Sequence, residues 1–100
     1  MENVTVNKLR AGLGTKYIDI NPSTGITNSE NGFRFNLDGS GYVSKSELSW
    51  DTAGNLYFGN TSPYAGYISA ADGSGYFAFN KFRWDTSGNI SLGGTNPAGI

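Results

Sequence analysis

The clearest pattern along the chain is an alternation of apolar and polar positions in short runs. Phe33, Phe35 and Leu37 are apolar, and the residues between them, Arg34 and Asn36, are polar. Successive side chains of a β-strand point to opposite faces, so this period of two predicts strands with one apolar and one polar face. No stretch shows the i, i+3, i+4, i+7 apolar spacing of an amphipathic helix. We therefore expect an all-β fold of short antiparallel strands.

The segments between these runs have the composition of tight turns. The segment 51–54 has Asp at its first and Gly at its fourth position, which is typical of a type I turn closed by a glycine with positive φ. The segments 38–41 and 21–25 are also turns, whereas residues 2–12 are compatible with a strand or a short helix. The expected strands form a β-meander and span 16–20, 33–37, 41–45, 47–50, 55–59, 66–71, 75–79, 81–84 and 89–92.

Two motifs recur at a fixed offset of 34 residues. The motif Asp-Gly-Ser-Gly-Tyr at 38–42 returns at 72–76, and Trp-Asp-Thr-x-Gly-Asn at 50–55 returns at 84–89. The apolar face stays apolar in both copies, whereas the other face varies, as where Ser49 is replaced by Arg83 and Tyr57 by Ser91. Repeat units usually need neighbours to bury their faces. We expect residues 32–66 to form β-repeat 1, residues 67–100 to form β-repeat 2, and residues 1–31 to be an N-terminal degenerate repeat or a connecting element.

Composition narrows the function classes. The chain of 100 residues has no cysteine and no histidine, which excludes disulfides, Cys or His metal ligands, and nucleophiles paired with histidine. The net charge of −1 offers no electrostatic case for binding nucleic acid. No apolar run approaches the roughly 18 residues of a membrane span. We expect a protein that is not an enzyme, has no cofactor and does not insert into a membrane, and whose small core is completed by partner chains.

One segment imitates a calcium-binding loop. Residues 36–47 follow the spacing of an EF-hand loop, with Asp38 and Glu47 at the third and twelfth positions. The flanking segments have no helical pattern. The copy 34 residues later has Ala70 and Lys81 at the first and last ligand positions. The turn recurs and the ligand set does not, so we expect no metal site here.

The aromatic residues divide into two groups. We expect Trp50, Phe58, Phe82 and Trp84 to be structural core aromatics, because they lie on the face that stays apolar in both copies. The tyrosines lie at turns or on the varying face, where they would contact a glycan or a subunit interface. This second group consists of Tyr42, Tyr57, Tyr64, Tyr67 and Tyr76.

The recurring acidic residues are best explained as turn residues. A pair of carboxylates can cleave a glycoside. However, an active site is a single constellation, whereas these acids occur twice at equivalent turn positions. An Asp at the start of a turn accepts hydrogen bonds from backbone N–H groups further along the turn. The expected turn residues are Asp38, Gly41, Asp51, Gly54, Asp72, Gly75, Asp85 and Gly88.

The order and spacing of these motifs resemble repeats in tail-fibre and other tail-associated proteins of bacteriophages. Those repeats carry Asp-Gly-Ser-Gly-Tyr, then Trp-Asp-x-x-Gly-Asn, then an apolar strand and a glycine, and the resemblance covers about residues 32–97. It implies a non-catalytic structural module of a tail fibre or tail spike that supports host attachment. It also implies a homotrimer in the virion tail appendage, made in the bacterial cytoplasm and assembled with other virion tail proteins. Three chains can close a core that one cannot, as a β-prism or β-spiral.

A second function stays open from the sequence. A monomeric carbohydrate- or cell-wall-binding β module would also carry exposed tyrosines, and a host surface glycan is an expected partner of either protein. The two differ in oligomeric state. In a trimer Trp50 and Trp84 would lie between chains or sheets, whereas in a monomeric binder several aromatics would line one open groove.

Overall fold

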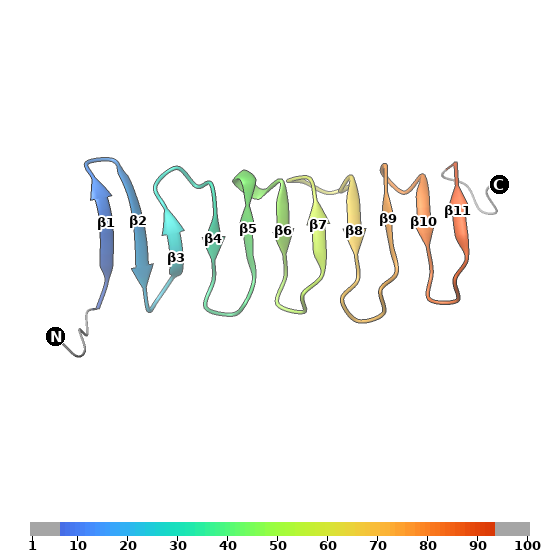
Figure 1. Cartoon of the computed structure of the whole chain (residues 1–100), viewed down its shortest axis with the longest axis horizontal. Helices are drawn as coiled ribbons and strands as arrows, with labels where there is room; N and C mark the ends of the chain where they lie inside the picture. Colours follow the sequence, from blue (N-terminus) through green and yellow to red (C-terminus); the bar gives the residue numbers. More distant parts are fainter. Residues whose placement is uncertain (1–6, 94–100) are drawn as a thin grey trace.

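A computed structural model describes residues 7–93, and within them eleven strands form a single antiparallel sheet. Each strand pairs with its neighbours in the chain, so the order in the sheet is the order in the sequence (Figure 1). This open meander confirms the all-β prediction. The sheet continues through residues 31–32 and 66–67, where the boundaries between the expected repeats lie. Residues 2–6 of the segment expected to be strand or helix, and residues 94–100 of the second expected repeat, lie outside the described residues. The strands are β1 (Leu9–Leu13), β2 (Lys16–Asn21), β3 (Gly25–Asn28), β4 (Arg34–Phe35), β5 (Gly41–Val43), β6 (Leu48–Trp50), β7 (Leu56–Phe58), β8 (Gly66–Ile68), β9 (Gly75–Phe77), β10 (Phe82–Trp84) and β11 (Ile90–Leu92).

Each of the expected strands overlaps an observed strand, but most of the observed strands are shorter than expected. The strand expected over 41–45 ends at Val43, where the chain enters the short 3₁₀ segment η1 (Ser44–Ser46). Ser44, Lys45 and Ser46 have φ of 51°, 54° and 73°, which no strand can accommodate. The strand expected over 75–79 ends at Phe77 for the same reason, because residues 78–80 also have positive φ.

The N-terminal third continues the sheet. β1 places residues 9–13 in a strand, and β3 adds a strand that is not among those expected from the sequence. β3 lies between β2 and β4, where Ile26 is opposite both Ile20 and Phe35. This apolar row joins the N-terminal strands to the rest of the sheet. No helix among residues 7–93 has the length and apolar character needed to cross a membrane.

The register gathers the apolar side chains on one side of the sheet, as the alternation predicts. Directly opposed residues share a face, and the pairings align Phe35, Trp50, Leu56, Ile68 and Trp84 in one row across the strands. Val43, Leu48 and Phe58 form a second row on that side. We call this side the apolar face; it carries Leu9, Ile18, Ile20, Ile26, Phe35, Val43, Trp50, Leu48, Leu56, Phe58, Ile68, Phe77, Phe82, Trp84, Ile90 and Leu92.

The opposite side carries a continuous row of polar and aromatic residues, one from each strand. Successive pairings link the members of this row from β1 to β11. We call this side the tyrosine face; its row is Arg10, Asp19, Thr27, Arg34, Tyr42, Ser49, Tyr57, Tyr67, Tyr76, Arg83 and Ser91.

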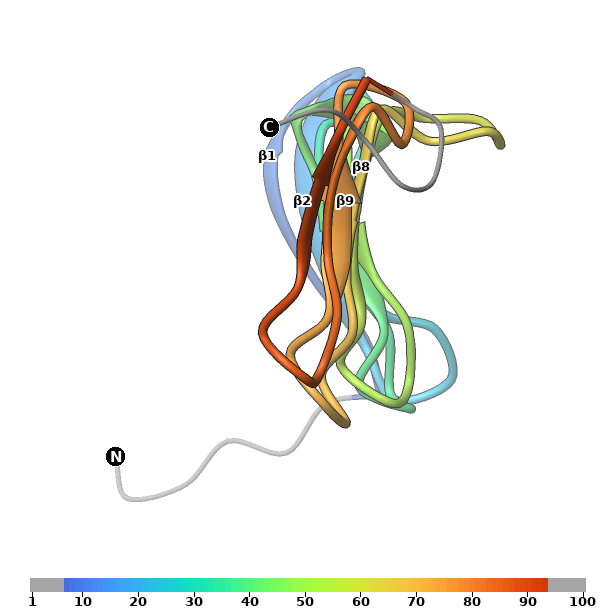
Figure 2. The ribbon, with the colours of Figure 1, turned by 90° about the vertical axis from the view of Figure 1, so that its right-hand side faces the viewer.

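The sheet is a single layer with no interior of its own. No apolar side chain is buried among the described residues. The chain measures 63 × 27 × 19 Å and has a radius of gyration of 18.6 Å, whereas a compact domain of this length would have about 13 Å. Its accessible surface is 6972 Å², against about 5,500 Å² for a compact protein of this mass. Viewed along the sheet, the strands stack into one thin and twisted layer (Figure 2).

Candidate functional site

The Asp residues that begin the β6–β7 and β10–β11 turns hold those turns by hydrogen bonds. Asp51 Oδ1 accepts from the backbone N–H groups of Ala53 at 3.0 Å and Asn55 at 3.1 Å, and its Oδ2 accepts from Asn55 Nδ2 at 3.0 Å. Asp85 Oδ1 accepts from the N–H groups of residues 87 and 89, both at 2.9 Å, and its Oδ2 accepts from Asn89 Nδ2 at 3.1 Å. The turn glycines Gly54 and Gly88 have positive φ of 86° and 85°.

The other two predicted acidic residues cap the turns before β5 and β9. Asp38 Oδ1 accepts from the backbone N–H of Ser40 at 2.9 Å and from its hydroxyl at 2.6 Å. Asp72 makes the same two contacts to Ser74, at 3.0 and 2.7 Å. These hydrogen bonds stabilise the charged carboxylates, and the bond from the serine hydroxyl has the largest effect. They lower the pKa of Asp38 and of Asp72 below the ordinary value.

Gly41 and Gly75 were expected in turns, but they begin strands β5 and β9, where the absence of a side chain makes room for the two tryptophan rings. A Cβ on Gly41 would be 2.7 Å from Trp50 Cζ2, and one on Gly75 would be 2.7 Å from Trp84 Cζ2. Each indole also donates its Nε1–H to a turn carbonyl: Trp50 to Gly39 O at 2.8 Å, and Trp84 to the O of residue 73 at 2.6 Å. The rings therefore lie flat along the apolar face.

Four of the five predicted tyrosines gather on the tyrosine face. The ring centroid of Tyr57 is 4.9 Å from that of Tyr64 and 5.1 Å from that of Tyr67. Tyr67 is 5.9 Å from Tyr76. Tyr64 belongs to the β7–β8 loop, which projects from the sheet (Figure 2, yellow). The fifth, Tyr42, is separated from this cluster because Ser49 of β6 stands between it and Tyr57 in the row.

The hydroxyl of Tyr57 is fixed by Asp51. It donates to Asp51 Oδ2 at 2.7 Å. This hydrogen bond, followed by that from Asn55, lowers the pKa of Asp51 from 3.8 to about 2. The same contact with the carboxylate, aided by desolvation, raises the pKa of Tyr57 from 10.0 to about 12. The pair therefore stays as ionised carboxylate and neutral phenol over a wide pH range.

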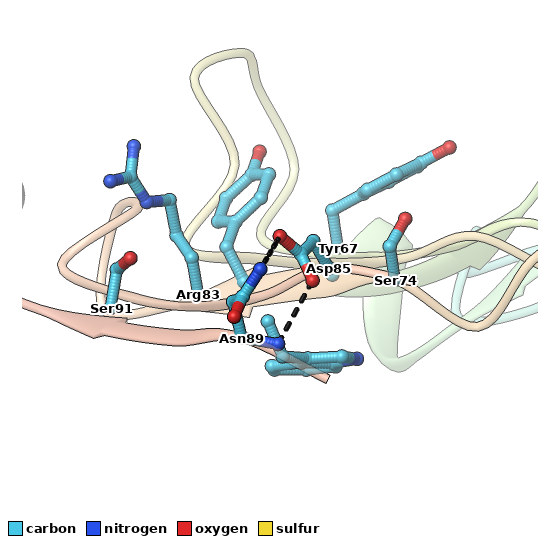
Figure 3. A pocket seen from close by; sticks show the side chains of 9 residues that line it. Tyr67, Ser74, Arg83, Asp85, Asn89 and Ser91 are labelled. Atoms are coloured by element: carbon cyan, nitrogen blue, oxygen red, sulfur yellow. Dashed lines mark hydrogen bonds between the residues drawn. The ribbon is translucent and has the colours of Figure 1, made fainter. Parts of the chain in front are cut away.

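A hollow of about 460 Å³ lies beside the tyrosine cluster, over β8 to β11. Arg83, Asp85 and Asn89 line it together with the rings of Tyr67 and Tyr76. In Figure 3 Arg83, Asp85 and Asn89 rise from the same side of the sheet, and dashed lines join Asp85 to Asn89. Arg83, Asn89 and Ser91 are not among the site residues expected from the sequence. The period-two phase that Arg83 shares with Tyr76 across the strands is the signal that could have found it.

The aromatics expected in the core lie on the apolar face. Phe58 is 5.3 Å from Phe77, and Trp84 is 5.8 Å from Phe77 and 6.0 Å from Phe82, measured between ring centroids. Trp50, Trp84 and Phe58 are half-buried, and Phe82 is 41% exposed. Within one chain these rings pack against one another along the surface of the sheet.

An ion-pair cluster at the N-terminal end was not anticipated. Arg10 donates from Nε to Asp19 Oδ1 at 2.7 Å and from an Nη to Asp19 Oδ2 at 2.8 Å, and Lys8 Nζ lies 3.5 Å from the same carboxylate. The Arg10 guanidinium also lies 3.6 Å from the ring centroid of Tyr17. The hydrogen bonds from Arg10 hold the pKa of Asp19 below its ordinary value.

The segment that imitates a calcium loop is built from strand and turn. β4 precedes this segment, and the 38–41 turn, β5 and the 3₁₀ segment η1 make up most of residues 36–47. Glu47 accepts a hydrogen bond from Asn60 Nδ2 at 3.2 Å. Among residues 7–93 no three His, Cys, Asp or Glu side chains cluster as a metal site would require.

Comparisons of the chain with models of protein families, with curated proteins and with solved structures found no match.

Proposed function

We propose that the protein is a non-catalytic structural module of a phage tail fibre or tail spike that supports host attachment, and that it works as a homotrimer. The observation that carries the proposal is the apolar face, which extends over all the strands of the sheet and is left uncovered by residues 7–93. An exposed apolar surface of this extent marks a protein interface. The sequence motifs that resemble tail-fibre repeats indicate the kind of assembly.

The short strands favour a closed three-sided arrangement. Every strand from β5 to β11 has three residues and so presents two positions on the apolar face, as Leu48 and Trp50 show in β6. Three residues span about 10 Å. Three sheets of this width can enclose an interior that their own apolar side chains fill, as in a β-prism. The 34-residue repeats would then lengthen the prism along the fibre axis.

Light scattering after size exclusion tests the proposal directly. We expect a mass of about three times 10.6 kDa, because burial of the apolar face should drive association. A stable monomer, or a dimer at every concentration tested, would overturn the homotrimer.

A specific observation favours a second candidate, a monomeric carbohydrate- or cell-wall-binding module. Tyr57, Tyr64, Tyr67 and Tyr76 form a connected aromatic surface beside a polar hollow. A monomer in solution that still binds a glycan through these tyrosines would support this candidate.

A further inference from the structure

The turns at Asp51 and Asp85 are alike in three hydrogen bonds and differ in a fourth. Asp51 Oδ2 accepts from the Tyr57 hydroxyl in addition to Asn55 Nδ2. At the second turn the residue that corresponds to Tyr57 is Ser91. Tyr57 is opposite Ser49 of β6, and Ser91 is opposite Arg83 of β10. Among the described residues Asp85 Oδ2 accepts only from Asn89 Nδ2. A carboxylate oxygen can accept two hydrogen bonds, so Asp85 retains an acceptor position.

The missing tyrosine also leaves space. The ring of Tyr57 packs against two other tyrosines, whereas the short side chain of Ser91 borders the hollow of about 460 Å³. Tyr67 and Tyr76 supply aromatic walls, and both are half-buried and therefore held in place. Asp85, seen at the centre of Figure 3, lies among the polar residues that line this space.

The lining combines groups that suit a polyhydroxylated ring. The hydrogen bonds from Asn89 keep the pKa of Asp85 below its ordinary value, so its carboxylate accepts and does not donate at neutral pH. Arg83 takes part in none of the ion pairs of the described residues, and its guanidinium can donate to ligand oxygens. Tyrosine rings offer flat apolar surfaces with a polar edge.

Two other ligand classes fit these groups less well. A phenol would replace the Tyr57 contact with one hydroxyl, but it would leave Arg83 and Asn89 without ligand partners. An anion would meet Arg83 but would be repelled by the Asp85 carboxylate. A neutral sugar has several hydroxyls that both donate and accept, and its C–H face can pack on an aromatic ring.

We propose that the hollow lined by Tyr67, Tyr76, Arg83, Asp85 and Asn89 binds one neutral pyranose unit of a glycan, with a sugar hydroxyl donating to Asp85 where Tyr57 donates to Asp51. The site lies on the tyrosine face, opposite the surface proposed for the trimer. It therefore does not depend on that assembly.

The test is a titration of the full chain with three probes, the methyl α-pyranosides of glucose, galactose and mannose. Backbone amide shifts of Ser87 and Asn89 report on the second turn. We expect at least one probe to shift these amides in a saturable way. The change Ser91→Tyr should weaken the affinity for that probe at least tenfold, because it rebuilds the tyrosine of the first turn inside the hollow. Asp85→Asn should weaken it about 10- to 100-fold, since it removes a hydrogen bond to a charged acceptor.

The matched control is Asp51→Asn at the first turn, which should leave the affinity unchanged. Far-UV circular dichroism shows whether each variant folds, and Ser91→Tyr introduces a residue that the first turn already accommodates. Absence of any shift with all three pyranosides would overturn the proposal, as would equal affinity of Ser91→Tyr and the unmodified chain. Binding only of p-cresol or only of N-acetylneuraminic acid would also overturn it. A trimer that fails to bind the probes would refute the sugar site alone, and a monomer that binds them would refute the trimer alone.

Discussion

At the scale of single residues, a few contacts decide how the turns and rings of this sheet are held. The Asp51–Tyr57 hydrogen bond of 2.7 Å ties a turn to the tyrosine face. Gly41 and Gly75 let an indole ring lie directly on the sheet. Single substitutions can test both kinds of contact through the free energy of unfolding.

The first prediction concerns Tyr57→Phe and pH. Asp51 has a folded pKa of about 2, below its ordinary 3.8, so its stabilisation is present above pH 3.8 and lost as pH falls toward about 2. Tyr57 has a folded pKa of about 12, above its ordinary 10.0, so its stabilisation is present below pH 10.0 and lost as pH rises toward about 12. Urea unfolding should show the largest deficit of Tyr57→Phe between pH 3.8 and 10.0.

The control for this prediction is Tyr42→Phe. Tyr42 lies on the same face, and its hydroxyl has no hydrogen bond within residues 7–93, so the deficit should not vary with pH. A deficit of Tyr57→Phe that stayed constant from pH 2 to pH 12 would contradict the role of the pair.

The second prediction concerns Gly41→Ala. The added Cβ would be 2.4 Å from the Arg34 carbonyl oxygen and 2.7 Å from Trp50 Cζ2. Relief of that overlap should cost about 1–3 kcal/mol of unfolding free energy. Chemical denaturation at a fixed chain concentration, followed by tryptophan fluorescence, measures it.

Gly32→Ala is the matched substitution. A Cβ there would be 3.5 Å from the Asn28 side chain, an ordinary contact, so the change should stay within about 0.5 kcal/mol. Equal losses for Gly32→Ala and Gly41→Ala would show that the tryptophan ring is not held against the strand.

At the scale of elements, the strands are short because left-handed turns interrupt them. Residues 44–46 and 78–80 are two runs of non-glycine residues with positive φ, placed 34 positions apart. The residue after each run donates its N–H back to the first residue of the run, Glu47 to Ser44 O at 3.1 Å and Lys81 to Ala78 O at 3.2 Å. The carbonyls of Glu47 and Lys81 accept from Gly59 and Gly93, just beyond the next strand, both at 2.8 Å. Non-glycine residues in this region cost roughly 1–2 kcal/mol each.

The third prediction follows from that cost. Ala78 has a φ of 51°, and Ala78→Gly should stabilise the fold by about 0.5–1 kcal/mol, because relief of the left-handed strain exceeds the entropy cost of glycine. Thermal unfolding at fixed chain concentration should show a higher midpoint. Ala53→Gly, at a turn position without positive φ, should lower stability by about 0.5–1 kcal/mol. A loss for both variants would contradict the strain argument.

At the scale of the whole molecule, the sheet has two unlike faces and no interior. The apolar face includes Phe77, Phe82 and Ile90, which are 40%, 41% and 52% exposed in the single chain. Water contact with these side chains is unfavourable, so the proposed association would add to the free energy that stabilises the sheet.

The fourth prediction tests which face associates. Ile90→Lys on the apolar face should reduce the mass by light scattering from about three chains to one, because a buried charge without a partner is strongly unfavourable. Ser49→Arg on the tyrosine face should leave the mass unchanged, since Arg83 already occupies the equivalent position in the second copy. Loss of assembly with Ser49→Arg alone would place the interface on the tyrosine face.

The sequence by itself determined most of the strands and the sorting of their side chains onto two faces. The alternation that separates Phe35 from Arg34 has the period of a strand, so strand positions and the two faces could be read locally. It also placed the four Asp residues, Gly54 and Gly88 in turns, since the backbone needs of tight turns are local. The ends of β5 and β9 could not be predicted, because the non-glycine residues with positive φ that follow these strands leave no signal in the composition.

Only the tertiary structure decided what lies beside what. The sequence shows Tyr57 replaced by Ser91, but the hollow and the open acceptor on Asp85 follow from the register that brings β8 to β11 together. The same is true of the bidentate pair between Arg10 and Asp19, which joins two strands. Local periodicity sets which way a side chain points, whereas its neighbours across the sheet are set by strand pairing, which depends on the whole chain.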